Sequence, residues 1–225
     1  MIDLSKYRII DLSHELFPSE QKTDGRQRHG RPVFGERPID LTEFFHSEDG
    51  SRMHFIHSQT HNGTHVEAPY KYAEDRADVA DMPLDTYIGV AAVCRFAGSA
   101  GGAVTPLELG RQGIARGDIV LAWGGPRREG GKPYLSLDAV DWLIETGVKA
   151  LGVENLGLMP PGEPKEGRLA ADARLLLAGV GLIDAVTGLD QISRSRVFFI
   201  GLPVRMHRLT ASWTRAVALE EISEG

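Results

Sequence analysis

The chain has 225 residues, of which 42% are apolar and 25% charged, an ordinary composition for a globular protein with a hydrophobic core. Its formal net charge of −6 argues against nucleic acid as a partner, because phosphate binding needs a basic face. The N-terminus lacks the apolar stretch of a signal peptide, no segment is apolar enough to cross a membrane, and Cys94 as the single cysteine excludes an intrachain disulfide. We therefore expect a cytoplasmic protein with no membrane partner.

Apolar runs bounded by turn residues predict a series of strands along the chain. Between the first two runs, the polar residues 19–38 predict a long mobile loop, which is either a functional lid, an oligomer contact or a disordered surface excursion. The runs that we assign to strands are residues 7–12, 53–59, 90–96, 119–123, 150–153, 181–186 and 197–202, with residues 210–222 as a final strand.

Helices are predicted between several of these strands. Ser136 is a suitable N-cap for a helix over residues 138–145, which Gly147 ends. A second helix is expected at about residues 171–178, and residues 104–110 form a short third one. Strands that alternate with helices favour an α/β fold, and no shift in composition divides the chain, so we expect one domain over residues 1–225.

The segment from residue 59 to residue 71 contains the clearest chemical pattern. His61, His65 and Glu67 lie within seven residues, and imidazole and carboxylate groups are usual ligands for divalent metals. Gly63 permits a tight bend between the histidines, and an extended chain after it places His65 and Glu67 on one face, with Val66 pointing away. On spacing alone, a metal site and a pair of ordinary hydrogen-bonded histidines are about equally good interpretations.

At these residues the sequence resembles the cyclase family, which includes bacterial kynurenine formamidases and isatin hydrolases. The segment His-Asn-Gly-Thr-His-Val-Glu-Ala-Pro at residues 61–69 is similar to the family signature HxGTHxDxP. The likeness extends over nearly the whole chain. Residues 11–14 resemble the opening strand, 117–121 the central GDIVL strand, 137–152 a helix and strand, and 210–218 the closing strand.

The resemblance implies a fold, an activity and a ligand set. The fold would be a single α/β domain of the swivelling β/β/α type, with a mixed barrel-like sheet and flanking helices, assembled as a homo-dimer or homo-tetramer. The activity would be hydrolysis of a small-molecule non-peptide amide, or of a cyclic amide or lactone, with manganese or zinc. His61, His65 and Glu67 would then be metal ligands.

The sequence departs from the family pattern at positions that matter for this chemistry. The motif acid is Glu67 where the family has Asp, and Lys71 stands where the family has a histidine acting as general acid and base. Three roles are open for Lys71. The first is a base with a strongly lowered pKa, the second an inert ion-pair partner of Glu67, and the third a cation that replaces a second metal.

A second metal site is implied in many family members by a late histidine and glutamate. The matching positions in this chain are Asp172 and Asp184, which would make such a site rich in oxygen and suited to manganese, magnesium or calcium. Asp184 is also a candidate, with Lys71, for moving protons in hydrolysis. The alternative to a hydrolase is a family member that cyclises, dehydrates or only binds a small molecule, because the base histidine is missing.

Overall fold

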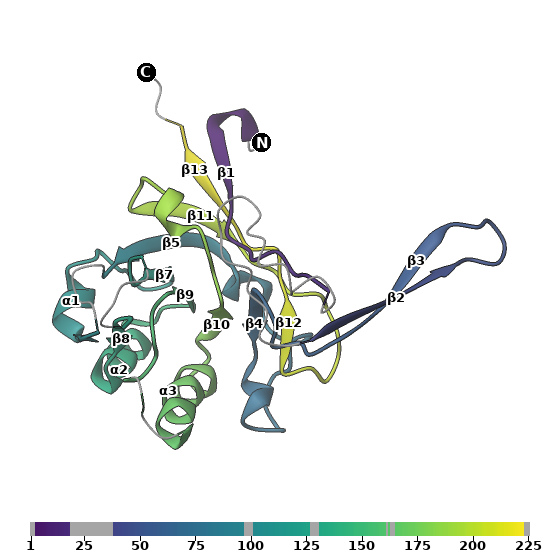
Figure 1. Ribbon diagram of the computed structural model, residues 1–225. Coiled ribbons are helices and arrows are strands. Elements are labelled where there is room, and N and C mark those ends of the chain that lie inside the picture. The colour runs from purple at the N-terminus through teal and green to yellow at the C-terminus, as the bar shows by residue number, and fades with distance from the viewer. Residues whose placement is uncertain are drawn as a thin grey trace.

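The computed structural model describes residues 3–18, 38–96, 101–126, 131–160, 162 and 165–222 (Figure 1). The loop predicted for residues 19–38 lies, apart from Pro38, outside the described residues. In the part of the chain that is described, no helix is both long enough and apolar enough to span a bilayer.

One mixed sheet of nine strands dominates the described structure. Its four central strands, β5, β7, β9 and β10, run parallel to one another, and the strands on either side pair antiparallel. In spatial order the strands are β1 (Tyr7–Asp11), β13 (Val217–Glu221), β11 (Arg196–Ile200), β5 (Ile88–Arg95), β7 (Ile119–Trp123), β9 (Ala150–Glu154), β10 (Gly181–Asp184), β4 (His65–Glu67) and β12 (Ala211–Trp213).

The connection between the last two strands requires the sheet to curl. Strands β12 and β13 are seven positions apart in the sheet, which in a flat sheet would separate them by about 34 Å. Only residues 214–216 join them, and so short a link spans no more than about 14 Å. The sheet therefore bends into the curved, barrel-like form seen in Figure 1, which confirms the predicted mixed α/β fold.

The same link corrects the prediction of one final strand over residues 210–222. The chain leaves the sheet after β12, where the backbone N–H of Thr214 donates to the Thr64 carbonyl. It re-enters as β13, after the N–H of Ala216 donates to Oγ of Ser13. In this bend Thr214 and Ala216 stay buried on either side of the exposed Arg215, an alternation that also suits a strand, so the sequence pattern alone does not mark the bend.

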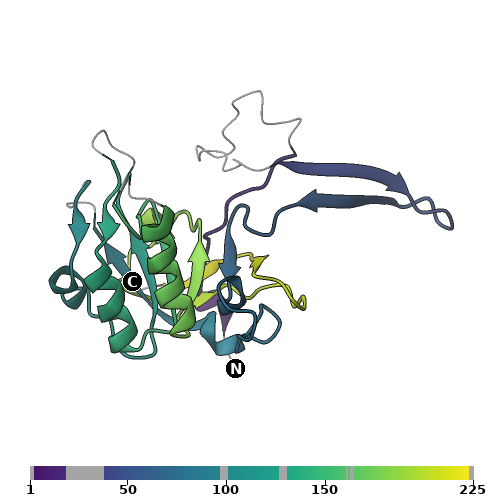
Figure 2. The same cartoon turned by 90° about the horizontal axis from the view of Figure 1, so that it is seen from below.

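Three α-helices, α1 (Pro106–Gly110), α2 (Leu137–Thr146) and α3 (Lys165–Leu177), lie together on one side of the sheet (Figure 2). The predicted cap of α2 is confirmed: Oγ of Ser136 accepts a hydrogen bond from the N–H of Ala139, and Gly147 ends the helix at a φ of 77°. Short 3₁₀ helices occur at Leu4–Lys6, Pro69–Lys71 (η4), Leu84–Thr86 and Leu189–Gln191.

Helix α3 begins at Lys165, earlier than the predicted residue 171. The residues before Ala171 are mostly polar, so the apolar period that identifies a helix starts only there. The other predicted strands are present, with ends shifted by no more than two residues. The central strands are buried on both faces. In β5, Ala91 and Val93 enter one apolar core, and Ala92 and Cys94 enter the core beneath the helices.

A hairpin of β2 (Ile39–Phe45) and β3 (Arg52–Ser58) projects from this body (Figures 1 and 2). The strand β2 was not predicted from the sequence, because its acidic residues interrupt the apolar run. Within the hairpin, the rings of Phe44 and Phe55 stack with centroids 4.6 Å apart.

The two short strands β6 (Ala103–Val104) and β8 (Tyr134–Leu135) form another pair. The predicted homo-oligomer stays a prediction.

The side chain of Glu220 in β13 forms hydrogen bonds with the first strand, β1, and with the loop before β11. Glu220 is buried, and its carboxylate accepts hydrogen bonds from Oγ of Ser193, the N–H of Arg194 and the guanidinium of Arg8. Burial raises the pKa of the Glu220 carboxyl, but these hydrogen bonds outweigh burial and lower the pKa to about 2.

We expect Glu220→Gln to lower the free energy of unfolding at pH 7 by about 2 kcal/mol. Because the folded pKa is depressed, the contribution of Glu220 is fully present above its usual pKa of 4.5 and disappears as the pH falls through about 2. Urea denaturation at pH 7 and pH 3 measures this, with the exposed neighbour Glu221→Gln as the control. A stability loss that does not shrink at pH 3 would contradict the assignment.

Candidate metal centre

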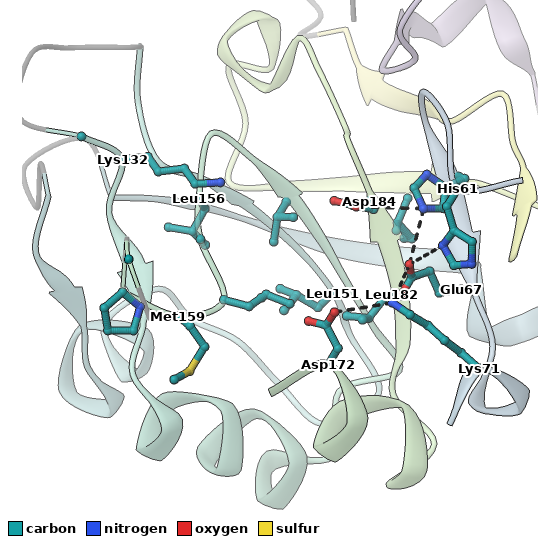
Figure 3. Close-up of a pocket in the computed structure, with 18 residues that line it drawn as sticks. His61, Glu67, Lys71, Lys132, Leu151, Leu156, Met159, Asp172, Leu182 and Asp184 are labelled. Atoms are coloured by element: carbon teal, nitrogen blue, oxygen red, sulfur yellow. Dashed lines mark hydrogen bonds and ion pairs between the residues drawn. The ribbon is translucent and has the colours of Figure 1, made fainter. Parts of the chain in front are cut away.

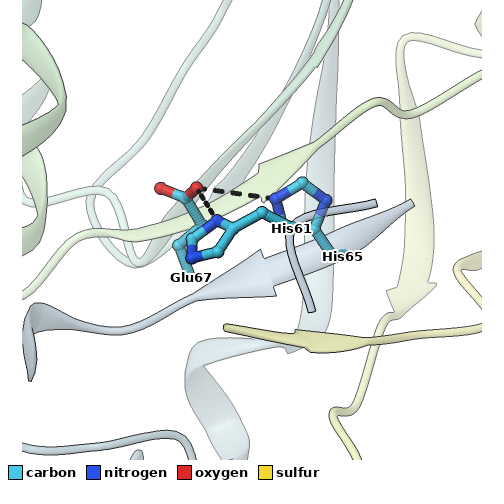
Figure 4. A group of neighbouring side chains, drawn as sticks. All are labelled: His61, His65 and Glu67. Atoms are coloured by element: carbon cyan, nitrogen blue, oxygen red, sulfur yellow. Dashed lines mark hydrogen bonds and ion pairs between the residues drawn. The ribbon is translucent and has the colours of Figure 1, made fainter. Parts of the chain in front are cut away.

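A tight turn between β3 and β4 carries the first of the predicted ligands. Gly63 in this turn has a φ of +60°, and a Cβ atom there would lie 2.3 Å from Cδ2 of Leu16. Only glycine satisfies both the backbone conformation and the close packing. The turn that the sequence predicts is therefore confirmed, and it brings His61 back beside the start of β4 (Figure 4).

Strand β4 supplies the other two predicted ligands. It lies between β10 and β12, with Val66 opposite both Ile183 and Ser212. Val66 is fully buried in the apolar core, while the side chains of His65 and Glu67 lie together with His61 on the opposite face. The predicted alternation is confirmed, and two antiparallel neighbours fix its register.

The three side chains converge on one point. Nδ1 of His61 lies 2.8 Å from Oε1 of Glu67, and Nε2 of His65 lies 3.5 Å from the same oxygen. One candidate ligand atom from each residue lies within 4.8 Å of the others. Two imidazoles and a carboxylate at this spacing are a suitable first set of ligands for a divalent ion such as zinc or manganese.

The hydrogen bonding of His65 fits a metal ligand. Its Nδ1 lies 2.8 Å from the Gly63 carbonyl, which only accepts, so Nδ1 carries the proton and Nε2 holds the lone pair. Among the residues that the structure describes, none forms a hydrogen bond with this buried Nε2. A backbone carbonyl that orients an imidazole in this way is typical of histidines that bind metals.

The electrostatics of Glu67 keep it ionised. Burial raises the pKa of this carboxyl, but His61, His65 and Lys71 outweigh burial and hold the pKa well below its usual range. Burial lowers the pKa of His65, but Glu67 and Asp184 more than compensate and raise it. The excess negative charge around His65 thus favours a cation at this position, either a proton or a metal ion.

Residues outside the sequence motif support the three side chains. Nε2 of His61 lies 3.0 Å from Oγ1 of Thr210, and the Tyr87 hydroxyl donates to the backbone carbonyl of Glu67 at 2.8 Å. Neither contact was predicted, because Thr210 and Tyr87 are distant in the sequence. The only feature of the sequence that pointed to Thr210 was its position at the start of residues 210–218, which resemble the closing strand of the family.

The remaining predicted residues gather around this centre. The ammonium of Lys71, at the end of η4, lies 2.7 Å from Oε2 of Glu67 and 3.5 Å from Oδ2 of Asp172 on α3. Oδ2 of Asp184, at the end of β10, lies 4.0 Å from Nε2 of His65. In the described structure, Asp172 and Asp184 are not part of the group whose ligand atoms lie within 4.8 Å. Their roles as metal ligands stay predictions.

A pocket of about 670 Å³ opens at this centre (Figure 3). Charged groups line one side, and apolar side chains from β9 and the segment after it line the other. Lys132 lies on the opposite side from Lys71, with Leu151 and Leu156 between them. This wall was not predicted from the sequence, although loops that follow parallel strands commonly form the binding sites of α/β proteins. Its members include Leu151, Val153, Leu156, Leu158, Met159 and Pro160.

A second cluster with ligand spacing consists of Asp78, Asp81 and His207. The carboxylate of Asp78 accepts hydrogen bonds from the backbone N–H groups of Ala80, Asp81 and Arg208. These bonds hold a turn together and account for the buried carboxylate, so this cluster has a structural role.

Comparisons with known proteins agree with this fold. The model of a family described as "Putative cyclase" matches residues 10–158. A kynurenine formamidase from Erythrobacter litoralis (strain HTCC2594) is 28% identical over 223 residues, covering 96% of this chain and 95% of that protein.

Solved structures share the fold at low sequence identity. Isatin hydrolase A from Labrenzia aggregata has a TM-score of 0.75 and 23% identity, covering 97% of this chain and 95% of that one. A structure described as a potential metal-dependent hydrolase with cyclase activity has a TM-score of 0.72 and 19% identity, covering 96% of this chain and 100% of that one.

We expect the purified protein to bind zinc or manganese, and we expect His65→Ala to weaken the affinity by more than about 100-fold. Loss of a group that only orients a ligand already costs about 10- to 100-fold, and loss of a ligand costs more. Elemental analysis and metal titration measure this. The exposed hairpin residue His57 provides the control variant His57→Ala. Equal metal binding by both variants would contradict the site.

Proposed function

The chain belongs to the cyclase family, and from this premise we propose that it is a metal-dependent hydrolase of small non-peptide amides, cyclic amides or lactones. The observation that carries the proposal is the lone pair on Nε2 of His65, buried without a hydrogen bond from any described residue and directed toward the carboxylate of Glu67 at the wall of a pocket. This arrangement suits a cation at the place where a substrate carbonyl would lie.

The names of the similar proteins support the reaction class. Kynurenine formamidase and isatin hydrolase are both hydrolases of carbon–nitrogen bonds outside peptides. The pocket of this chain has an apolar wall that suits the flat ring of such a substrate, and its charged side holds the proposed metal ligands. An arylformamide or a cyclic aryl amide combines the two required parts, a ring and a carbonyl.

We propose that His61, His65 and Glu67 hold the metal. A divalent ion bound there supplies Lewis acidity, which activates water and polarises the substrate carbonyl. The protein contributes the orientation of the ligands, through Gly63 and Thr210, and a pocket wall that limits access of bulk water. Either zinc or manganese suits this set of two nitrogens and one oxygen.

We assign the transfer of protons to Asp184 rather than to Lys71. Burial lowers the pKa of Lys71, but the charges of Glu67 and Asp172 outweigh burial and raise the pKa, so the ammonium stays protonated and is a poor base. The side chain of Asp184 is 57% exposed and lines the pocket beside His65. Its Oδ2 accepts a proton from the attacking water and returns it to the leaving nitrogen as the C–N bond breaks.

We expect Asp184→Asn to lower kcat by about 100- to 10,000-fold with formylated arylamines, cyclic amides or lactones as substrates, because the amide cannot accept the proton. Metal content distinguishes the two roles predicted for this residue. Retained metal with lost activity identifies a base, whereas loss of both identifies a ligand. Asp190→Asn, an exposed residue of the last 3₁₀ helix, is the control.

The wild-type protein decides between the two functions that the sequence left open. A protein that binds its metal and hydrolyses none of the formamides, cyclic amides and lactones in a broad panel would contradict the hydrolase proposal. That result would favour a member of the family that cyclises, dehydrates or binds a small molecule.

A further inference from the structure

Lys71 occupies a fixed position between two carboxylates. Its Nζ lies 2.9 Å and 2.7 Å from the two oxygens of Glu67 and 3.5 Å from Oδ2 of Asp172 (Figure 3). The side chain is 22% exposed, and the carboxylates of Glu67 and Asp172 are also largely buried. An ammonium group placed so close to both neutralises the repulsion between them.

Local structure holds the ammonium in this position. Pro69 begins the 3₁₀ helix η4, and the N–H of Lys71 donates to the carbonyl of Ala68 at 3.0 Å. The ammonium also lies 5.2 Å from the centroid of the Tyr72 ring, a favourable cation–π distance. A flexible surface lysine would lack these restraints, so the position is built into the fold.

The charges around Glu67 set how many metal ions the site can accept. Among the described residues, the carboxylates of Glu67, Asp172 and Asp184 line this side of the pocket together with the ammonium of Lys71. With both histidines neutral, these four described groups carry a net charge of −2, which one divalent ion balances. A second divalent ion would leave an uncompensated charge of +2 in a largely buried site, which is costly.

We propose that Lys71 is a resident cation that fills the space between Glu67 and Asp172, so that this chain binds one divalent ion and not two. The inference rests on the proposed function, because it assumes the metal held by His61, His65 and Glu67. It gives Lys71 a positioning role. The ammonium of Lys71 contacts both Glu67 and Asp172 and so fixes the position of the Glu67 carboxylate. The same carboxylate also contacts His61.

Metal stoichiometry tests this inference directly. We expect native mass spectrometry and titration with zinc or manganese to find one ion per wild-type chain. Lys71→His replaces the ammonium with a neutral ligand beside Glu67 and Asp172, and we expect it to bind two ions per chain. Lys132→Met removes a lysine from the opposite wall of the same pocket, and we expect it to bind one ion.

Each result separates the inference from the function on which it rests. Two ions per wild-type chain would overturn the role of Lys71 and leave the metal-dependent hydrolase intact. One ion in both the wild type and a folded Lys71→His, with folding checked by circular dichroism, would also overturn it. If the histidine variant does not fold, Lys71→Gln serves instead: without the ammonium, a second ion should bind to the three carboxylates. Absence of any bound ion would contradict the proposed function itself.

Discussion

The buried carboxylate of Glu67 is the group on which the arrangement of the site depends. A charged group in an apolar interior costs several kcal/mol unless it is paired and hydrogen-bonded. Glu67 faces His61, His65 and Lys71, all within 3.5 Å, and its backbone is tied to Tyr87. The turn at Gly63, the register of β4 and the short helix η4 all serve to place these partners.

The fold supplies this carboxylate with neighbours that are distant in the sequence. The strand order of the sheet places β4 between β10 and β12, so that Asp184 at the end of β10 lies near His65 and Thr210, just before β12, lies beside His61. Helix α3 brings Asp172 to the same pocket. The site thus lies where the parallel and antiparallel parts of the sheet meet, and neither part alone would assemble it.

Local chemistry was predictable from the sequence, and long-range geometry was not. The bend at Gly63, the outward and inward faces of β4, and the cap at Ser136 each follow from a few neighbouring residues, and the structure confirms them. The hairpin strand β2 and the split of the closing strand depend on contacts across the fold. The ion pair of Lys71 with Glu67 was one of three roles that the sequence left open. The short distance from Nζ of Lys71 to the Glu67 carboxylate supports the role of a resident cation, and the raised pKa of Lys71 argues against the role of a base.

Anomalous X-ray scattering from crystals soaked in manganese or zinc tests the central claim most directly. We predict a peak in contact with the side chains of His61, His65 and Glu67, with the Lys71 ammonium still beside Glu67. A peak at the cluster of Asp78, Asp81 and His207 alone, or no peak near Glu67 at saturating metal, would contradict the account. Either result would mean that the carboxylate of Glu67 is compensated by the protein's own cations and needs no metal ion.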